Sequence, residues 1–167
     1  TDSGAGGTAL ACGQKTNNKC IGMTADSIPI KSILHYAEMN NKATGLVATA
    51  AITHATPAAT YSKSAERNWE DISDMPAEAI EQGCQDIALQ LINFEQNLEQ
   101  RYQDVDIDGI EVVFGGGRRH FLPKEAAFNS ADAVSEIEGD RSDSLDLTAQ
   151  WQTSYPQGKY IIDQAGF

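Results

Sequence analysis

The sequence lacks several features that would assign it to a class at once. No stretch of its 167 residues is long and apolar enough to cross a membrane as a helix. Only three cysteines occur, and no C-x-x-C pair or Cys/His spacing predicts a structural zinc site. Aromatic residues make up 7% of the chain, but hydrophobic residues reach 41%. This composition is typical of one folded globular domain rather than a disordered chain.

Basic residues are also scarce. Twelve Lys and Arg stand against 24 Asp and Glu, which gives a formal net charge of -12 at pH 7. Such a charge repels nucleic acid and anionic membrane surfaces, so neither is an expected partner. A bound anion must therefore be held by a local group of donors, a cation or a metal. The excess of acid also agrees with a halophilic, salt-rich habitat, where the charge is screened.

The cysteines Cys12, Cys20 and Cys84 form an odd set. Cys84 lies on the apolar face of a predicted helix, so we expect it in the core. Cys12 and Cys20 are close enough in sequence to form a small disulfide, but two free thiols are an equally open alternative. A disulfide would favour an oxidising compartment.

Hydrophobic periodicity predicts an alternation of helices and apolar strands. The predicted helices are 27–43, 77–98 and 145–152, and the predicted strands are 46–52, 110–114 and 159–162. Continuously apolar strands that alternate with helices are typical of a mainly parallel sheet with helices on both faces. The sequence therefore predicts an α/β/α three-layer sandwich in one domain. Residues 124–144 are acidic and weakly patterned, and we interpret them as a surface insertion within it.

The opening stretch DSGAGGT, which begins at Asp2, is the first candidate site. A helix over 4–11 would place Ser3 at its N-terminal end, where free N–H groups and the helix dipole favour an anion. Gly4 has no side chain to block an approaching phosphate. A serine needs a base or a metal to become a nucleophile, and no histidine is adjacent. Activation by a metal is therefore favoured. A trypsin-like protease is disfavoured, because its D-S-G-G-P pattern is absent.

Five motifs together resemble one known family, the alkaline phosphatases. They are DSGAGGT from Asp2, THATPAA from Thr53, ERNW from Glu66, QGCQDIA from Gln82 and FGGGRR from Phe114. Their order and spacing are similar to the family's, and the resemblance covers most of the chain, being weakest from 126 to 144. It implies a part of the three-layer α/β/α domain of a longer enzyme, similar to the animal and marine bacterial members.

The resemblance implies that the protein hydrolyses phosphate monoesters. Ser3 would be the nucleophile that becomes phosphoserine, with its oxygen on a zinc ion, in a site of two zinc ions and one magnesium ion. Arg67 matches the arginine that grips two phosphate oxygens through its planar fork of donors. Asp2 matches the aspartate that orients this arginine. Ser3, Gly4 and Arg67 would together contact the substrate.

The same resemblance implies roles for the second motif. Thr56 matches a hydroxyl ligand of the magnesium site. His54 stands where some bacterial members carry aspartate and where animal and marine bacterial members carry histidine. A histidine disfavours direct magnesium binding, so it would act through water or shift the site towards zinc. His35 and His120 match no ligand and are expected to be structural or solvent-facing. The glycines 115–117 are interpreted as a tight turn with a basic rim and no catalytic part.

The remaining Asp, His and Glu ligands of the family cannot be identified in this chain. The resemblance therefore implies a segment of a longer enzyme that is inactive alone. It also implies a homodimer in the periplasm or outside the cell, which takes phosphate monoesters and inorganic phosphate. Two alternatives stay open. One is a phosphodiesterase or sulfatase of the same superfamily, which usually carries threonine or a modified cysteine as nucleophile. The other is a phosphate-binding module without catalysis that keeps Ser3, Gly4 and Arg67.

Overall fold

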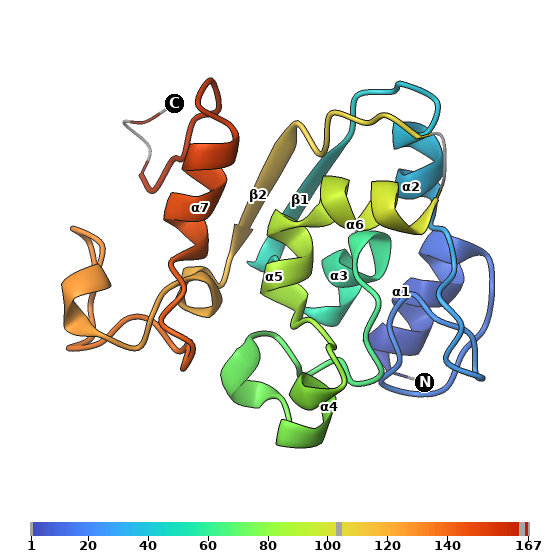
Figure 1. Ribbon diagram of the computed structural model, residues 1–167, viewed down its shortest axis with the longest axis horizontal. Coiled ribbons are helices and arrows are strands. Elements are labelled where there is room, and N and C mark those ends of the chain that lie inside the picture. Colours follow the sequence, from blue (N-terminus) through green and yellow to red (C-terminus); the bar gives the residue numbers. More distant parts are fainter. Residues whose placement is uncertain (1, 103–104, 164–165, 167) are drawn as a thin grey trace.

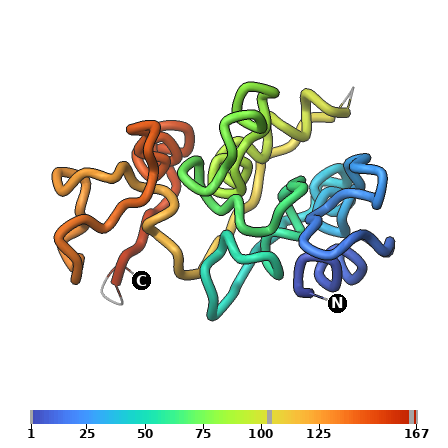
Figure 2. Tube along the Cα trace, turned by 90° about the horizontal axis from the view of Figure 1, so that it is seen from below, coloured from blue at the N-terminus to red at the C-terminus, as the bar shows by residue number. Residues whose placement is uncertain are grey.

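A computed structural model describes residues 2–102, 105–163 and 166 of the chain. Its helices and strands are α1 (Ser3–Cys12), α2 (Ile33–Glu38), β1 (Gly45–Ala51), α3 (Ala55–Tyr61), η1 (Ile72–Asp74), α4 (Ala77–Glu81), α5 (Ile87–Ile92), α6 (Phe94–Arg101), β2 (Val112–Gly116), η2 (Arg118–Phe121), η3 (Ala126–Phe128) and α7 (Leu147–Ser154). Figures 1 and 2 place the N-terminal and C-terminal parts at opposite ends of the molecule. Among the helices described, none is long and apolar enough to cross a membrane.

The sheet confirms the predicted α/β class. β1 and β2 pair in parallel, with Leu46 opposite Val113. A parallel pair needs a long crossover, and here the crossover contains α3, α4, α5 and α6. Both strands were predicted, at 46–52 and 110–114, and each observed strand is displaced by one or two residues at its ends. The described residues thus contribute a parallel strand pair with flanking helices (Figure 1).

One hydrophobic core joins the sheet to the helices around it. Its members come from β1, α2, α3, α5, α6 and α7 and include Leu46, Ala58, Ile87, Phe94, Leu98 and Leu147. The strands themselves are covered unevenly, because Leu46 of β1 is buried whereas Val47 is 77% exposed and every residue of β2 is exposed. Within the described part of the chain, the sheet therefore contributes to the core mainly through Leu46.

The helix predicted over 27–43 is much shorter in the structure. Ser27 has a positive φ of 62° and lies in a turn, so it does not cap a helix. The N-cap is instead Ser32, whose side chain accepts a hydrogen bond from the backbone of His35. Asn41, with φ 51°, follows the end of α2. Turn chemistry in this segment overrides the helical spacing of its apolar residues.

The prediction of a helix within 77–98 was correct only in pieces. Gly83, at φ 78°, ends the α4 turn, and Asp86 then caps α5 by accepting a hydrogen bond from the N–H of Leu89 at 2.8 Å. Cys84 falls in the break between the two helices and is exposed. The expectation that Cys84 lies in the core is therefore wrong, because the helix on whose apolar face it was predicted is interrupted between Glu81 and Ile87.

The third predicted strand, 159–162, is not a strand. The segment makes no ladder among the described residues, and Tyr160 and Ile162 are 41% and 40% exposed. An apolar run becomes a strand only when a neighbouring edge accepts its hydrogen bonds, and here the run lies across a cavity from β2.

The glycine run 115–117 is only partly a turn. Gly115 and Gly116 extend β2, where a Cβ on Gly115 would lie 3.0 Å from the Cβ of Ile52. Gly117 alone adopts a left-handed conformation, at φ 87°, and a Cβ there would lie 2.7 Å from that of Ala51. The run is therefore required mainly by close packing against β1.

The expected alternative of a Cys12–Cys20 disulfide does not occur, because both cysteines are free. Cys20 lies beside the first half of α1, where its carbonyl oxygen approaches Gly4 and accepts a hydrogen bond from Thr8. The thiol of Cys12, at the end of α1, instead faces the carbonyl oxygen of Ala59 at 3.9 Å.

The segment 124–144 is held by a pairing between the residue just before it, Pro123, and Arg141 near its end. Pro123 and Arg141 form an isolated parallel bridge. The guanidinium of Arg141 is fully buried and donates to both carboxylate oxygens of Asp86, at 3.1 and 3.0 Å, and also to Asp143. This buried pair ties the segment to the start of α5.

The expected basic rim after the glycine run is neutralised by that segment. Arg118 forms ion pairs with Glu138 at 2.5 Å and with Asp132 at 2.8 Å. Arg119 lies 3.3 Å from Asp140. The rim is therefore a set of ion pairs rather than an open anion site.

Candidate active site

Ser3 is the first residue of α1 and is exposed. The helix is capped by Asp2, whose Oδ1 accepts a hydrogen bond from the N–H of Ala5 at 3.0 Å. The other carboxylate oxygen accepts from the N–H of Lys19 at 2.9 Å. The prediction that Ser3 lies at a helix N-terminus is thus confirmed, and Asp2 performs the capping that leaves the Ser3 hydroxyl available.

Arg67 reaches Ser3 from a turn 64 residues further along the chain. Its Nη1 donates a hydrogen bond to the Ser3 Oγ at 2.5 Å. The same nitrogen lies 3.6 Å from the Asp2 carboxylate. The structure therefore brings together the three residues that the sequence predicted as nucleophile, phosphate-binding arginine and orienting aspartate.

The Asp2 carboxylate is held in its charged form. Partial burial works to raise its pKa, but hydrogen bonds from the backbone of Ala5 and Lys19 and the charge of Arg67 lower it more. The pKa of Asp2 is consequently below its ordinary value. A charged carboxylate at this point fixes the guanidinium beside Ser3 by attraction.

Two glycines of the opening motif allow close packing of α1. A Cβ on Gly4 would lie 3.2 Å from the backbone of Lys19, so this glycine is required by the neighbouring chain as well as by any ligand. A Cβ on Gly7 would lie 3.0 Å from the Cβ of Ala59 and 3.6 Å from the carbonyl oxygen of Thr56. α1 therefore packs directly on α3, the helix that carries Thr56.

His54 and Thr56 lie together at the N-terminus of α3. His54 is the residue just before the helix, and Thr56 is exposed in its first turn. The Nε2 of His54 lies 3.8 Å from a carboxylate oxygen of Glu70. These two residues lie at the start of α3, which packs against α1, the helix that begins with Ser3.

The other two histidines, His35 and His120, are buried rather than solvent-facing. His35 completes the capping box of α2. His120 pairs with Asp71, its Nδ1 lying 2.6 Å from the carboxylate, and both side chains are buried. His120, Asp71 and Asp74 also bring their ligand atoms within 4.8 Å of one another. Sequence reasoning missed this pairing, because nothing in the spacing of Asp71 and His120 indicates contact.

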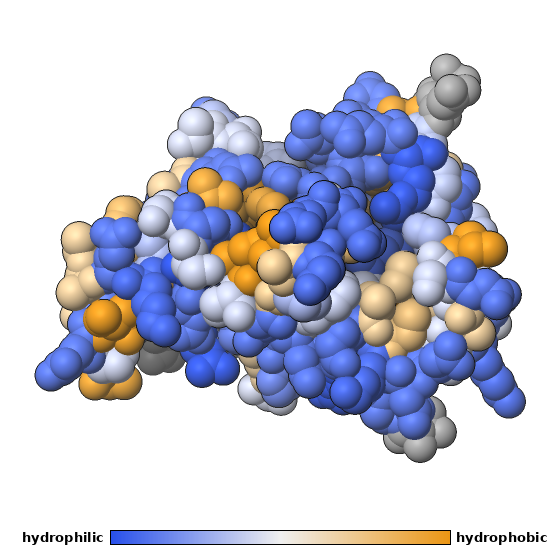
Figure 3. All heavy atoms as spheres, turned by 60° about the horizontal axis from the view of Figure 1, so that its bottom comes forward, coloured by the Kyte–Doolittle hydropathy of each residue, from blue (hydrophilic) through white to orange (hydrophobic). Residues whose placement is uncertain are grey.

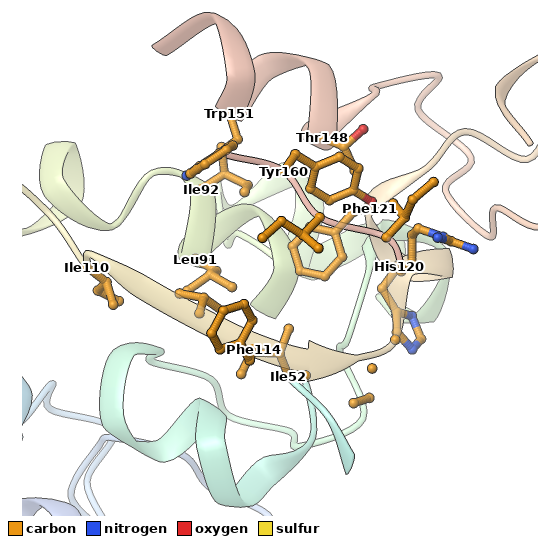
Figure 4. A pocket seen from close by; sticks show the side chains of 18 of the residues that line it. Ile52, Leu91, Ile92, Ile110, Phe114, His120, Phe121, Thr148, Trp151 and Tyr160 are labelled. Atoms are coloured by element: carbon orange, nitrogen blue, oxygen red, sulfur yellow. The ribbon is translucent and has the colours of Figure 1, made fainter. Parts of the chain in front are cut away.

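A large cavity lies apart from Ser3. It has a volume of about 960 Å³, and neither Ser3 nor Arg67 lines it. Figure 4 shows apolar side chains of β2, α5, α7 and the segment after α7 in its walls, among them Leu91, Phe114, Trp151 and Tyr160. His54 also lines the cavity. Figure 3 shows a largely hydrophilic face on which hydrophobic side chains gather near the middle. The cavity is therefore a mainly apolar space beside β2 that His54, but neither Ser3 nor Arg67, lines.

The donor types fit part of a metal site. Ser3 and Thr56 present exposed hydroxyl oxygens, and the side chain of His54 is 52% exposed. Oxygen donors suit magnesium, and an imidazole nitrogen suits zinc. A catalytic zinc usually takes three protein ligands, so these side chains fit as a contribution to a larger ligand set.

Comparisons with known proteins identify the family of the chain. The sequence profile of the alkaline phosphatase family matches residues 1–166. The tissue-nonspecific alkaline phosphatase of Gallus gallus is 36% identical over 95% of this chain and 30% of its own length. The structure of alkaline phosphatase from the Antarctic bacterium TAB5 is similar, with a TM-score of 0.59 and 30% identity over 92% of this chain and 32% of its own. The Thermus thermophilus alkaline phosphatase is similar too, with a TM-score of 0.60 and 31% identity over 92% of this chain and 24% of its own.

The chain belongs to the alkaline phosphatase family. It spans about a third or less of the length of these relatives. The predicted family and the α/β fold are therefore confirmed, and the roles of single residues rest on the geometry above.

Proposed function

We propose that this chain carries the nucleophile and the phosphate-binding arginine of an enzyme that hydrolyses phosphate monoesters. The observation that supports this most directly is the 2.5 Å contact between Arg67 and Ser3. A serine hydroxyl at a helix N-terminus with an arginine fork beside it is suited to a phosphate group. Relatives that carry the name alkaline phosphatase support the same reaction class.

The proposed reaction has two displacement steps at phosphorus. In the first, the Ser3 oxygen attacks the phosphorus and its proton passes to solvent, while the bond from phosphorus to the alcohol oxygen breaks and the alcohol takes up a proton from solvent. In the second, water attacks the phosphorus of the phosphoserine, the bond to the Ser3 oxygen breaks, and a proton from the attacking water is balanced by one taken up by Ser3, which releases inorganic phosphate. Arg67 would hold two phosphate oxygens throughout and offset the charge that builds up on them. Gly4, directly after Ser3, is proposed to contact the substrate through its backbone.

Three side chains are proposed as metal ligands. Ser3 would contribute to a zinc site, while Thr56 and His54 would contribute to a magnesium site, within a set of two zinc ions and one magnesium ion. When bound, such ions stabilise the attacking and leaving oxygens of an in-line displacement. The remaining ligands would come from outside this chain, and we expect the 167 residues alone to bind zinc weakly and to be inactive.

A homodimeric state and a periplasmic or extracellular location are proposed from family membership alone. Adaptation to high salt is proposed from the net charge of -12. A second enzyme class is less well supported, because Ser3 takes the place where phosphodiesterases and sulfatases of the superfamily usually carry threonine or a modified cysteine.

Trapping the phosphoenzyme tests the proposal. The intact protein that contains this chain would be incubated with radiolabelled inorganic phosphate, acid-quenched and analysed by peptide mapping. We expect the label on Ser3, its loss in Ser3→Ala, and its retention in Ser154→Ala, a control at an exposed serine of α7. Normal labelling of Ser3→Ala would falsify the assignment. Phosphate binding without labelling of the unmodified protein would instead favour a phosphate-binding module.

A further inference from the structure

Glu70 is a carboxylate that the sequence analysis did not assign to any role, and it lies next to the candidate metal-binding histidine. One of its carboxylate oxygens is 3.8 Å from the Nε2 of His54. The other accepts a hydrogen bond from the Thr53 hydroxyl at 2.5 Å and lies 3.3 Å from the Nε2 of His120. Both oxygens of Glu70 therefore have defined neighbours, and His54 is one of them.

The backbone and the side chain of Glu70 are both well anchored. The N–H of Ala88, in α5, donates to the carbonyl oxygen of Glu70 at 3.0 Å. The side chain of Glu70 is only 17% exposed, whereas that of His54 is 52% exposed. A half-exposed side chain samples several rotamers unless a fixed partner restricts it. Glu70 is thus the fixed member of this pair, and His54 is the one that needs orienting.

Behind Glu70 lies the buried pair of His120 and Asp71. The His120 Nδ1 is 2.6 Å from the Asp71 carboxylate, and Arg119 donates a hydrogen bond from its Nε to the His120 Nε2 at 3.3 Å. Asp71 is held in turn by Ser73, whose N–H donates to it at 2.8 Å. The His120 ring marks one end of the cavity in Figure 4. A chain of contacts therefore runs from the core, through His120 and Glu70, to His54.

We infer that Glu70 is a positioning residue that orients the His54 ring towards the proposed magnesium site. The inference rests on the proposed function, in which His54 contributes to that site. At 3.8 Å the Glu70 carboxylate is within ion-pair distance of the His54 Nε2 but beyond hydrogen-bond distance. Its attraction for an N–H at this nitrogen would leave Nδ1 to face a metal ion or a water molecule bound to one. Such partners of metal-binding histidines typically change metal affinity 10–100-fold when they are replaced.

The decisive measurement is magnesium affinity rather than activity. Zinc-loaded intact protein would be dialysed against buffered Mg²⁺, and bound magnesium would be measured by elemental analysis. We expect Glu70→Gln, which keeps the size but removes the charge and replaces one acceptor oxygen by a donor, to weaken magnesium binding roughly 10–100-fold. Glu78→Gln, at an exposed position of α4, is the matched control and should bind magnesium normally.

A double-mutant cycle separates positioning from a general structural effect. If Glu70 acts through His54, the loss caused by Glu70→Gln should disappear in a His54→Ala background. Thr53→Val, which removes the hydroxyl that holds Glu70, should weaken magnesium binding in the same direction and remains informative if Glu70→Gln fails to fold. Unchanged affinity in Glu70→Gln, or effects that simply add in the double variant, would overturn the inference. Labelling of Ser3 in the same proteins reports independently on the proposed function.

Discussion

Arg67 donates a hydrogen bond to Ser3 through its Nη1, and the carboxylate of Asp2 lies 3.6 Å from the same nitrogen. That these residues share one site could be predicted from the sequence because the motifs that contain them resemble those of the alkaline phosphatases in order and spacing. The position of Glu70 could not, because a single carboxylate in a turn resembles any surface acid until the fold places it between His54 and His120.

Replacing Arg67 by lysine should weaken phosphate binding. Lysine keeps the charge but loses the two-pronged set of donors, so inhibition by inorganic phosphate should weaken by about 1–3 kcal/mol. The inhibition constant for phosphate measures this, with Arg101→Lys, at an exposed site of α6, as the control. An unchanged inhibition constant would place Arg67 outside the phosphate site.

His35 makes stability depend on pH. Burial, together with the nearby charges of Lys63, Arg101 and Lys31, lowers its pKa from 6.5 to about 2. Below pH 6.5 the unfolded chain takes up a proton that the folded protein refuses, so stability is complete above pH 6.5 and falls as pH decreases. The loss between pH 6.5 and 4.5 should be about 2–3 kcal/mol for this group.

The His35→Gln variant tests this dependence. Glutamine at this position of a capping box still offers an oxygen to the Ser32 N–H, but it does not titrate. Urea unfolding at pH 6.5 and pH 4.5 should therefore show a smaller loss for the variant than for the unmodified protein. Equal losses would show that the neutral imidazole is not the cause.

At the scale of elements, the strands were easier to predict than the helices. β1 and β2 are continuously apolar, and that pattern persists whatever the surrounding loops do. The helices are short, with boundaries at Gly83, Asp86 and Ser32. Such boundaries depend on local turn and capping interactions, and the spacing of apolar residues carries no information about these interactions. Helical periodicity therefore overestimated the helices at 27–43 and 77–98.

The packing of α1 on α3 can be tested with two adjacent glycines. A Cβ on Gly6 would meet nothing within 4 Å, whereas a Cβ on Gly7 would meet Ala59 at 3.0 Å. Gly6→Ala should therefore raise the free energy of unfolding by about 1 kcal/mol through helix propensity. Gly7→Ala should fail to gain this stability, because α1 must move away from α3, and the rate of Ser3 phosphorylation should fall. Equal stabilisation by both substitutions would contradict the close packing.

At the scale of the whole molecule, Arg141 connects two distant parts of the chain. Its guanidinium and the carboxylate of Asp86 are fully buried, 55 residues apart in sequence. Burial raises the pKa of Asp86, although Arg141 opposes this rise. Asp86 lies in the QGCQDIA motif, but nothing in the sequence indicated that it pairs with Arg141, because the pairing of two distant charges depends on the complete fold.

Removing Arg141 should be costly. Arg141→Ala would leave the Asp86 carboxylate buried without its partner, and we expect a loss of about 3–5 kcal/mol in the free energy of unfolding. Arg119→Ala, which breaks the exposed pair with Asp140, should cost about 0–1 kcal/mol. Urea denaturation of both variants measures the difference, and similar small losses would mean that Arg141 does not tie the segment to α5.

The pairing of Pro123 with Arg141 also determines how the protein responds to cutting. The intervening segment is largely exposed and reaches full exposure at Val134, so a protease has its easiest access there. Both ends of the segment are held by contacts that do not depend on the continuity of the backbone between them. If a protease cleaves the chain near Val134, the two fragments should therefore migrate together in a native gel and separate only in denaturant. The same property makes this tip a natural place to split the protein or to insert a tag.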